Sequence, residues 1–402
     1  KGLGLVRQLP EGRETQEMEL ALRVGFGGVA SAIEGYSAQD IEENYGRMLA
    51  LSSSLDRPGE GFRAHLGLGA FYEVGGKLEK SQKHCDECLR SAELSGDEDE
   101  LLHAHRLLGE VNFFKGEFQE SCDHFKAALS YYDADAHLRL IRALGDDPGV
   151  LSHMYNALSL WFLGFPERAE ASCRLGLQLA STLGHAFSSA QADFYASWLY
   201  AFERDFPRAK TYAERAIDVC QAQQFALVLG SSQVIRGWAM AQLKEQDGSE
   251  EEILQGMALI RGPRADICES AFLSMLADFH LIRGNLEMGL SVAEESRNVA
   301  NERFGDPERL RLHGELLVSG DEAKAEALFR EAMAKARQQN SLSMALRAGL
   351  SLQRLLADTG RAQEGEKILR NIYGQFSEGF DTPDLLQASA ILNVTQGSSR
   401  HG

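Results

Sequence analysis

Short turns built on glycine recur along the chain at intervals near 40 residues, and this regularity constrains the fold more than any other feature. The glycines of these turns stand at positions 76, 116, 164, 284, 320 and 360. The 120 residues between Gly164 and Gly284 divide into three intervals if Arg204–Pro207 and Gln246–Gly248 are degenerate turns. A period of this length is typical of solenoids, in which each unit buries its apolar face only against its neighbours.

The segments between turns carry apolar residues at helical spacing. In Asp321–Gln338, the most regular example, Ala325, Phe329 and Ala332 line one face of a helix while the charged residues stay off it. Small residues at such positions let two paired helices approach closely. Proline accounts for only 8 of 402 residues, about 2% against a usual ~5%, as expected where helix interiors fill most of a chain. The pattern predicts an all-α, TPR-like superhelix. This is a solenoid of helical hairpins with the sequence pattern of tetratricopeptide repeats.

The turns divide the chain into about nine hairpins. The first helix of each regular hairpin is predicted at Phe62–Val74, Leu101–Lys115, Gly149–Leu163, Ala186–Arg204, Ala226–Lys244, Ala265–Arg283, Glu308–Ser319 and Leu342–Thr359. The partner helices follow each turn. Glu17–Leu55 is predicted to form a degenerate pair, and Leu3–Leu9 the end of an earlier unit.

Irregular segments set the expected boundaries. Residues 1–61 are predicted to be degenerate hairpins that continue an upstream repeat, because the chain begins in mid-helix like a cut from a longer protein. Residues 62–376 form the predicted superhelix, and 377–402 a capping segment with a frayed tail. Four further features are an inserted loop with a helical piece at Tyr131–Pro148, a charged connection at Asp247–Glu252, a short helix opened by Pro383, and fraying over Asn393–Gly402.

Composition excludes several classes of protein. The 41 Lys and Arg residues stand against 59 Asp and Glu, a net charge of −18, which disfavours direct nucleic-acid binding because phosphate contacts need clustered cations. Pro148–Pro166 has no charged residue, but its polar residues opposite Leu151, Leu158 and Phe162 indicate a buried helix, not a membrane span. The N-terminus has no signal-peptide core, and the six cysteines show no disulfide framework spacing. We expect a cytoplasmic protein.

Several stretches resemble one known type of protein, in order over almost the whole chain. They are LLHAHRLLGEVNFFKGEFQESCDHFKAALSYYD (Leu101–Asp133), the DPGV of Asp147–Val150 with the following helix that ends LWFLGFPERA, IRGWAMAQ (Ile235–Gln242), LRLHGELL (Leu310–Leu317), YGQFSEGFDTPDL (Tyr373–Leu385) and GVASAIEGYSAQDIEENYGRMLAL (Gly28–Leu51). These resemble the C-terminal tetratricopeptide region of bacterial proteins that join a class III adenylate/guanylate cyclase domain, or a DNA-binding activator domain, to a STAND/AAA-type ATPase. No nucleotide-binding or cyclase motif occurs in this chain. The resemblance therefore implies the sensory or scaffolding part of such a protein.

The three tryptophans are the first candidates for a binding surface. Trp161, Trp198 and Trp238 lie three or six residues before their turns. In tetratricopeptide hairpins these first-helix positions point into the concave groove, where aromatic rings provide binding area at low entropy cost. The alternative is that the three rings pack between repeats, since Trp is most often partly buried core.

The same counting places four charged residues on the inner surface: Arg63, Arg106, Glu110 and Asp278. Mixed charge there suits a peptide or partner segment held by a few polar anchors. A clamp for a chain terminus would need clustered Lys, Arg and Asn, and only Arg63, Arg106 and Asn112 approach that pattern. The alternative is an ordinary charged solenoid surface.

Histidine and cysteine crowd into two consecutive units, at His84, Cys85, Cys88, His103, His105, Cys122 and His124. His84 and Cys88 are four residues apart, a spacing that two zinc ligands can use, but structural zinc sites usually use turn-borne CxxC pairs and these cysteines lie within a helix. We predict no metal and no cofactor. No serine stands in a nucleophile motif, so we expect no catalysis by this chain.

The sequence therefore predicts a non-catalytic interaction and signal-sensing domain of a larger bacterial regulatory protein. Its partner would be a protein or peptide bound in the concave groove, including other domains of the same protein, and binding would control an attached ATPase, cyclase or transcriptional output. Two alternatives stay open: a small-molecule sensor with an enclosed pocket, walled by the three tryptophans, and a pure oligomerisation scaffold that forms a homo-oligomer.

Overall fold

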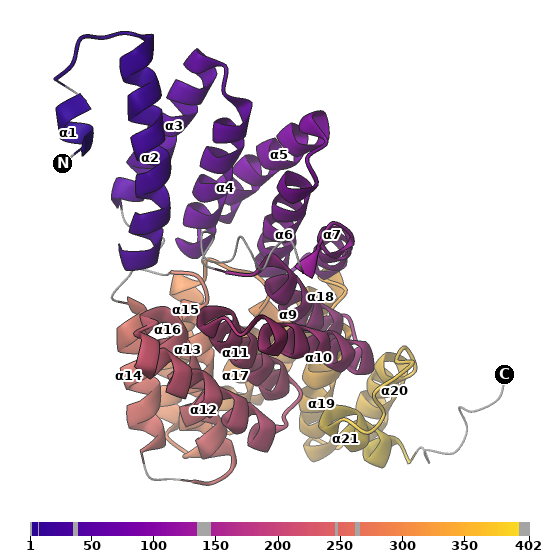
Figure 1. The fold of residues 1–402 in the computed structure, drawn as a ribbon. Coiled ribbons are helices and arrows are strands. Elements are labelled where there is room, and N and C mark those ends of the chain that lie inside the picture. The colour runs from indigo at the N-terminus through magenta and orange to yellow at the C-terminus, as the bar shows by residue number, and fades with distance from the viewer. Residues whose placement is uncertain are drawn as a thin grey trace.

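The computed structural model of the chain describes residues 2–6, 8–34, 39–134, 146–245, 248–261 and 266–393, and for residues 26–34 and 39 the backbone alone. Within these ranges every regular element is an α-helix, which confirms the predicted all-α class. Successive helices pack against one another in pairs along a curved solenoid (Figure 1).

Nine hairpins make up the described part of the chain. They pair α2 (Arg13–Glu34) with α3 (Gln39–Leu55), α4 (Pro58–Val74) with α5 (Leu78–Ser95), α6 (Glu98–Lys115) with α7 (Phe118–Ser130), α9 (Pro148–Phe162) with α10 (Pro166–Leu183), α11 (Ala186–Phe202) with α12 (Phe206–Gln223), α13 (Ala226–Gln242) with α14 (Ser249–Arg261), α15 (Glu269–Ile282) with α16 (Leu286–Val299), α17 (Asp306–Leu317) with α18 (Glu322–Gln338) and α19 (Leu342–Asp358) with α20 (Ala362–Tyr373). The short helix α1 (Gly2–Val6) precedes them, and α21 (Pro383–Leu392) packs on α19 and α20. The eight predicted first helices agree with α4, α6, α9, α11, α13, α15, α17 and α19 to within a few residues.

The predicted turns form for a local conformational reason. Gly76, Gly116 and Gly164 all adopt positive φ, which ends a helix at little cost because glycine has no Cβ. Arg204, in the first degenerate turn, takes the same left-handed conformation without glycine (φ 61°), and so does Lys244 (φ 63°), two residues before the second predicted turn. What recurs about every 40 residues at these turns is therefore the left-handed backbone conformation, whereas the residue type at the turn varies.

Small residues hold the paired helices close together. A Cβ added at Gly109 in α6 would lie 2.6 Å from the ring of Phe125 in α7, and one at Gly314 in α17 would lie 2.6 Å from the ring of Phe329 in α18. Both rings are completely buried. The regular spacing of Phe329 with Ala325 and Ala332 thus has the packing role that the sequence predicts.

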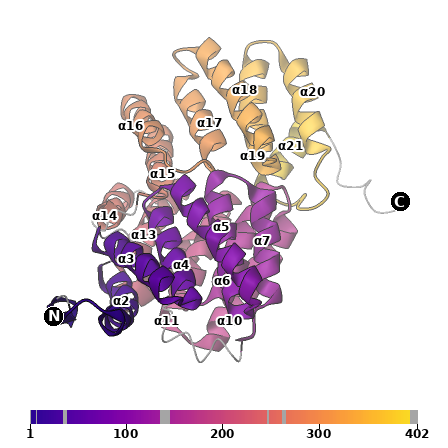
Figure 2. The same ribbon diagram turned by 90° about the horizontal axis from the view of Figure 1, so that it is seen from above.

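The solenoid returns onto itself after about half its length, so that later hairpins lie alongside earlier ones (Figure 2). Four carbonyl oxygens, each two residues before a positive-φ turn residue, accept hydrogen bonds from the later part of the chain. They are Val74 from Ile267 N (3.0 Å), Phe114 from Arg303 N (2.7 Å), Phe162 from Ser341 Oγ (3.2 Å) and Phe202 from Arg347 Nη2 (2.5 Å). We call this row of contacts the inter-turn seam. It satisfies carbonyls that a helix C-terminus leaves unpaired.

Several details differ from the sequence prediction. The predicted charged connection at Asp247–Glu252 is shorter, because α14 begins at Ser249 and its first turn takes up Glu250, Glu251 and Glu252, which the helix dipole favours there. The first helix predicted to reach Arg204 ends at Phe202. Most of the predicted insertion at Tyr131–Pro148 and the frayed end after Asn393 lie outside the described residues.

The uncharged stretch Pro148–Pro166 forms α9, a helix buried on nearly all sides. In the part of the chain that the structure describes, no helix combines the length and the apolar character needed to cross a bilayer. Leu151, Leu158 and Phe162 belong to one continuous apolar core that extends from Leu78 to Leu392.

Candidate functional site

A cavity of about 310 Å³ lies inside the solenoid, where the returning hairpins face the earlier ones. Its walls come almost entirely from the first helices of successive hairpins, α11, α13, α15, α17 and α19, closed by the segment around Phe304. Each of these helices contacts the next first helix along the chain. The cavity therefore depends on several repeats at once.

Aromatic rings form one side of the cavity. Trp198 stacks on Phe202 with 5.7 Å between ring centroids and lies 6.2 Å from Phe272. Trp238 packs edge-on against Phe206 at 5.2 Å. Trp238 is partly exposed, as are Phe202 and Phe206, whereas Trp198 is 1% exposed. This side offers flat apolar surface for a ligand.

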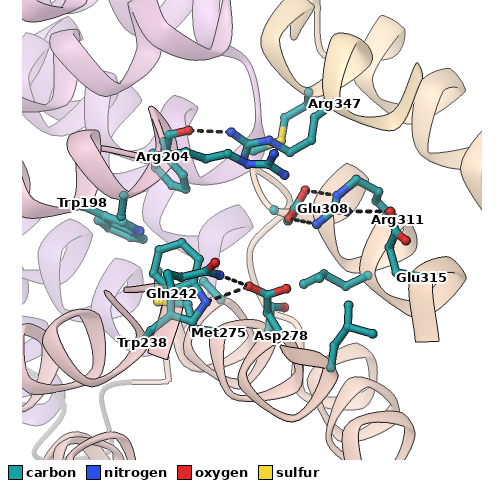
Figure 3. Close-up of a pocket in the computed structure, with 18 of the residues that line it drawn as sticks. Trp198, Arg204, Trp238, Gln242, Met275, Asp278, Glu308, Arg311, Glu315 and Arg347 are labelled. Carbon is teal, nitrogen blue, oxygen red and sulfur yellow. Dashed lines mark hydrogen bonds and ion pairs between the residues drawn. The ribbon is translucent and has the colours of Figure 1, made fainter. Parts of the chain in front are cut away.

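Charged side chains from α17 form the opposite side, as Figure 3 shows. Arg311 donates to both oxygens of Glu308, at 2.9 and 2.6 Å, and to Glu315 at 3.1 Å. Burial alone would raise the pKa of Glu308, but the neighbouring Arg311, with Arg347 and Arg204, lowers it to about 2. Glu308 is therefore ionised at every physiological pH.

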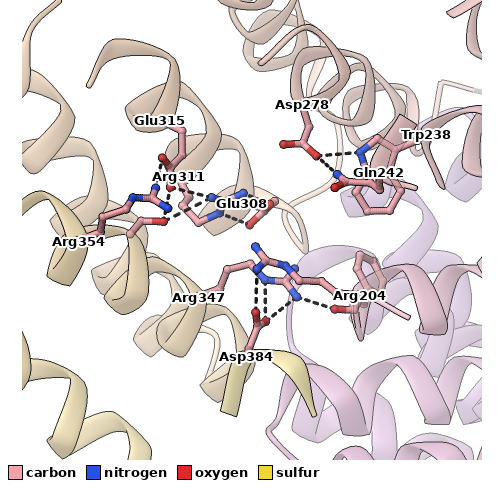
Figure 4. Close-up of polar contacts among 12 residues, drawn as sticks. Arg204, Trp238, Gln242, Asp278, Glu308, Arg311, Glu315, Arg347, Arg354 and Asp384 are labelled. Carbon is pink, nitrogen blue, oxygen red and sulfur yellow. Dashed lines mark hydrogen bonds and ion pairs between the residues drawn. The ribbon is translucent and has the colours of Figure 1, made fainter. Parts of the chain in front are cut away.

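A second ion pair lies next to the cavity, between Arg347 of its lining and Asp384 (Figure 4). Arg347 donates two hydrogen bonds to Asp384 of α21, at 3.0 and 2.8 Å, besides its bond to the Phe202 carbonyl in the inter-turn seam. Burial opposes ionisation of Asp384, yet Arg347 and Arg204 lower its pKa below the ordinary value. These contacts join α11, α19 and α21 at one point.

Two charged groups of the cavity are less completely matched. Asp278 in α15 accepts hydrogen bonds from Trp238 Nε1 (2.9 Å) and Gln242 Nε2 (2.6 Å), both at Oδ2, and it forms no ion pair with any described residue. Burial raises its pKa, against the opposing effect of Arg311. Arg204 lies 3.1 Å from Asp384, and its guanidinium donates no hydrogen bond to any residue that the structure describes.

The structure brings three of the predicted site residues together and separates the other four. Trp198, Trp238 and Asp278 line the cavity. Trp161 is 4% exposed and lines a separate cavity of about 20 Å³, so the prediction that all three indoles face one surface is wrong. Trp161 instead stacks on Phe202, because its place on α9 points to the seam.

The remaining three predicted residues lie in the earlier hairpins. Arg106 and Glu110 form a buried ion pair of 2.6 Å within α6, outside the lining of the cavity. Burial and the nearby Glu110 raise the pKa of Glu73, which shares this cluster. Arg63 is exposed and faces Glu60 at 3.6 Å. A binding role for these three residues stays a prediction.

Sequence reasoning missed the residues that give the cavity its charge: Arg204, Glu308, Arg311, Arg347 and Asp384. One signal was available for Arg204, since the 40-residue period places an arginine where other turns have glycine. Nothing in the sequence brings Arg347 and Asp384 to Arg204, because the inter-turn seam joins segments about 140 to 190 residues apart.

The histidine-rich units contain two equivalent histidine pairs. His65 and His84 lie 2.9 Å apart at Nδ1, and so do His105 and His124, exactly one 40-residue unit further along. Burial lowers the pKa of each of the four side chains. Within the described ranges, no three residues of the metal-ligand types His, Cys, Asp and Glu are grouped as a metal site requires.

No protein-family model matches the chain, and no curated protein matches it in sequence. Its structure is similar to that of a Rap protein complexed with competence and sporulation factor, with a TM-score of 0.63 and 12% identity over 89% of this chain and 98% of the Rap chain. It is also similar to the apo quorum sensor NprR from B. thuringiensis, with a TM-score of 0.50 and 12% identity over 90% of this chain and 98% of NprR. A STAND protein with a tetratricopeptide repeat sensor from Pyrococcus horikoshii scores 0.44, at 13% identity over 84% of this chain and 53% of that one, too low to bear on the fold. At these identities the first two similarities show the fold alone, a TPR-like helical repeat.

Proposed function

We propose that this chain is a non-catalytic signal-reception domain of a larger bacterial regulatory protein, and that a segment of a protein or peptide binds in the 310 Å³ cavity. The cavity itself is the observation that carries the proposal. Its volume falls in the range of about 300–1,000 Å³ that ligand pockets occupy, and its aromatic and charged sides are typical of such sites. A few side chains of a ligand fill this volume.

The comparisons support a role in signalling. The Rap protein of similar fold was crystallised with competence and sporulation factor, and NprR is a quorum sensor. Both proteins are matched over almost their full length by this chain. A common fold used for signal reception in those two proteins favours the same use here, with a different ligand.

The inter-turn seam offers a route from ligand to output. A ligand in the cavity touches α11 on the earlier side and α15, α17 and α19 on the returning side, so binding changes how the two sides dock. We propose that this change controls an attached ATPase, cyclase or transcriptional activator domain, as the sequence resemblance implies. The cytoplasm is the compartment we propose, since all six cysteines are free thiols.

Selection from a random peptide library tests the proposal. The wild-type chain serves as bait, and the variant Ala271→Trp, which places a large ring in the cavity wall, serves for counter-selection. We expect peptides that bind the wild type and lose affinity at least about tenfold with Ala271→Trp. The matched variant Ala323→Trp, at an exposed site of α18, should bind them normally. Peptides that bind Ala271→Trp as tightly as the wild type would contradict the proposal.

A small-molecule sensor is a second candidate, favoured by the aromatic rings and charged groups that face one another across the cavity. Trp198 and Trp238 line the cavity, so their fluorescence reports its occupancy. Titration with metabolite mixtures separates the two candidates. A change with metabolites and none with selected peptides would favour the sensor for small molecules.

A further inference from the structure

The charges around the cavity balance with two exceptions. Arg311 and Arg354 hold Glu308 and Glu315, and Arg347 holds Asp384 in a two-bond ion pair. This leaves Arg204, which shares Asp384 without donating a hydrogen bond to it, and Asp278, which has no cationic partner among the described residues. Arg204 and Asp278 form no ion pair with one another.

Arg204 occupies a turn position where its backbone is unfavourable. Its φ of 61° lies in the left-handed region, and the equivalent positions 76, 116 and 164 hold glycine. An L residue adopts this conformation at a cost, and of the two turn residues Arg204 and Lys244 that do so, only Arg204 lines the cavity. The structure directs that side chain into the cavity (Figure 3).

The helix that leads to Arg204 also contains a buried hydrogen-bond donor without a partner. Trp198 is 1% exposed, and its Nε1 has no hydrogen-bond partner in the described structure. Buried indole N–H groups normally find an acceptor. The guanidinium of Arg204, which lines the cavity, suits an anionic oxygen group, since a guanidinium binds a carboxylate with two parallel hydrogen bonds.

Asp278 lies on the other side of Glu308 from Arg204, as both close-up views show (Figures 3 and 4). Its Oδ2 is held by Trp238 and Gln242, which leaves Oδ1 without a hydrogen-bond partner in the described structure. The aromatic ring of Trp238 lies beside it. A carboxylate next to a partly exposed indole is the combination that attracts a cationic nitrogen group.

From these observations, we propose that the cavity binds a zwitterionic ligand, with a carboxylate at Arg204 and a cationic nitrogen at Asp278. This inference rests on the proposed function in one respect, that the cavity is the binding site. A peptide that ends in a lysine or arginine carries both groups in one residue, the α-carboxylate and the side-chain cation. A free basic amino acid has the same chemistry, and the experiment separates the two sources.

Four probes test the proposal in the wild-type chain by tryptophan fluorescence or calorimetry. They are N-acetyl-Ala-Ala-Lys with a free carboxylate, the same peptide as its C-terminal amide, N-acetyl-Ala-Ala-norleucine with a free carboxylate, and free lysine. We expect the C-terminal amide, which lacks the carboxylate, and the norleucine peptide, which lacks the cation, each to bind at least about tenfold more weakly. Each of these changes removes a charge-assisted hydrogen bond in a partly buried site.

Two variants assign each charge to its protein partner. Arg204→Gly introduces the residue that equivalent turns carry, and it should abolish the preference for the free carboxylate over the amide while keeping the preference for lysine over norleucine. Asp278→Asn keeps an acceptor for Trp238 and Gln242. It should abolish the preference for lysine over norleucine and keep the preference for the free carboxylate over the amide. Lys244→Gly is the matched control, because Lys244 has the same backbone conformation at a turn but does not line the cavity. It should bind all probes as the wild type does.

The outcomes distinguish this inference from the proposed function. If library-selected peptides bind in the cavity without dependence on either charge, the zwitterion inference is overturned and the proposed function stands. If free lysine binds, needs both Arg204 and Asp278, and no peptide binds, the zwitterion inference is supported. The same result would contradict a protein or peptide partner. If no probe binds up to about 1 mM, or both variants weaken all probes equally, the zwitterion inference is overturned.

Discussion

Trp198 and Trp238 occupy equivalent positions in consecutive first helices, but their surroundings differ. Trp198 is 1% exposed and contacts Phe194, Phe202 and Phe272, whereas Trp238 is partly exposed and donates its N–H to Asp278. The first ring is both core and cavity wall. The second is placed to meet a ligand without supporting the core to the same extent.

We therefore predict unequal effects of truncation. Trp198→Ala should cost about 3–5 kcal/mol of unfolding free energy, in the range of large aromatic truncations in cores, and Trp238→Ala clearly less. Urea unfolding followed by circular dichroism measures both. An equally large loss for Trp238→Ala would show that this residue is core and would remove it from the ligand-binding surface.

The two histidine pairs predict a dependence of stability on pH. Burial lowers the folded-state pKa of His65, His84, His105 and His124 below the ordinary value near 6.5, so below that pH the unfolded chain binds protons more readily than the folded chain. The neutral pairs contribute their full stability above pH ~6.5. This contribution is lost as the pH falls through the lowered pKa values of the histidines in the folded state.

Replacing one pair tests this dependence. The double variant His65→Gln and His84→Gln should lose less stability than the wild type between about pH 7 and pH 5. Because His105 and His124 occupy the equivalent positions in the next unit, the matching double variant should behave in the same way. Parallel stability curves for the wild type and both variants would contradict the prediction.

At the scale of elements, close approach of paired helices depends on glycine at particular positions. A Cβ at Gly109 would lie 2.6 Å from the ring of Phe125, which is completely buried and cannot move away freely. Gly109→Ala should therefore destabilise the chain by about 1–3 kcal/mol. Gly46→Ala, in α3 with no neighbour within 4 Å, should instead stabilise it by about 0.5–1 kcal/mol. Thermal unfolding distinguishes the two, and equal signs would contradict the packing argument.

The hairpins were predictable from sequence because their information is local. Gly116, Phe118 and Phe125 specify a turn and a packed face within ten residues, and the same spacing recurs at Gly320 and Phe329, although Gly320 does not adopt positive φ. The structure confirms these elements. The start of α14 was not predicted, because its three glutamates look like a linker, although acidic residues are also favoured in the first turn of a helix.

The cavity was predictable only in part. Counting back from the turns identified Trp198, Trp238 and Asp278 as inward-facing residues, since their place in the repeat sets their direction. Trp161 lies three residues before its turn, and the other three residues lie six before theirs, so Trp161 is on a different face of its helix and stacks on Phe202. Counting also could not identify Arg347, because the contact of Arg347 with the Phe202 carbonyl joins residues 145 positions apart and leaves no local pattern.

At the scale of the whole molecule, the inter-turn seam determines whether the inner space is a groove or a cavity. Gly164 has φ of 91°, and a Cβ there would lie 2.9 Å from Leu342 across the seam. Gly284 has a similar φ of 75°, but its added Cβ would meet nothing within 4 Å. The two glycines therefore separate backbone strain from packing across the seam.

Alanine substitution at these two positions measures the seam directly. Gly284→Ala should lower the free energy of unfolding by about 1 kcal/mol because of backbone strain at positive φ. Gly164→Ala should lower it by at least about 1 kcal/mol more, because it also disturbs packing across the seam. Small-angle X-ray scattering should show a larger radius of gyration for Gly164→Ala alone. Equal losses and identical scattering would indicate that the seam contributes little to closure of the solenoid.

We propose that this domain receives its ligand in the cavity between α11, α13, α15 and α17. Photo-crosslinking tests this proposal most directly: a library-selected peptide carries a diazirine, and mass spectrometry identifies the residues to which it attaches. We predict attachment to the cavity wall, at residues such as Trp198, Trp238, Met275 and Leu312, and its loss with Ala271→Trp. Attachment to the outer helices α5, α7, α10 or α12, unchanged by Ala271→Trp, would contradict the account.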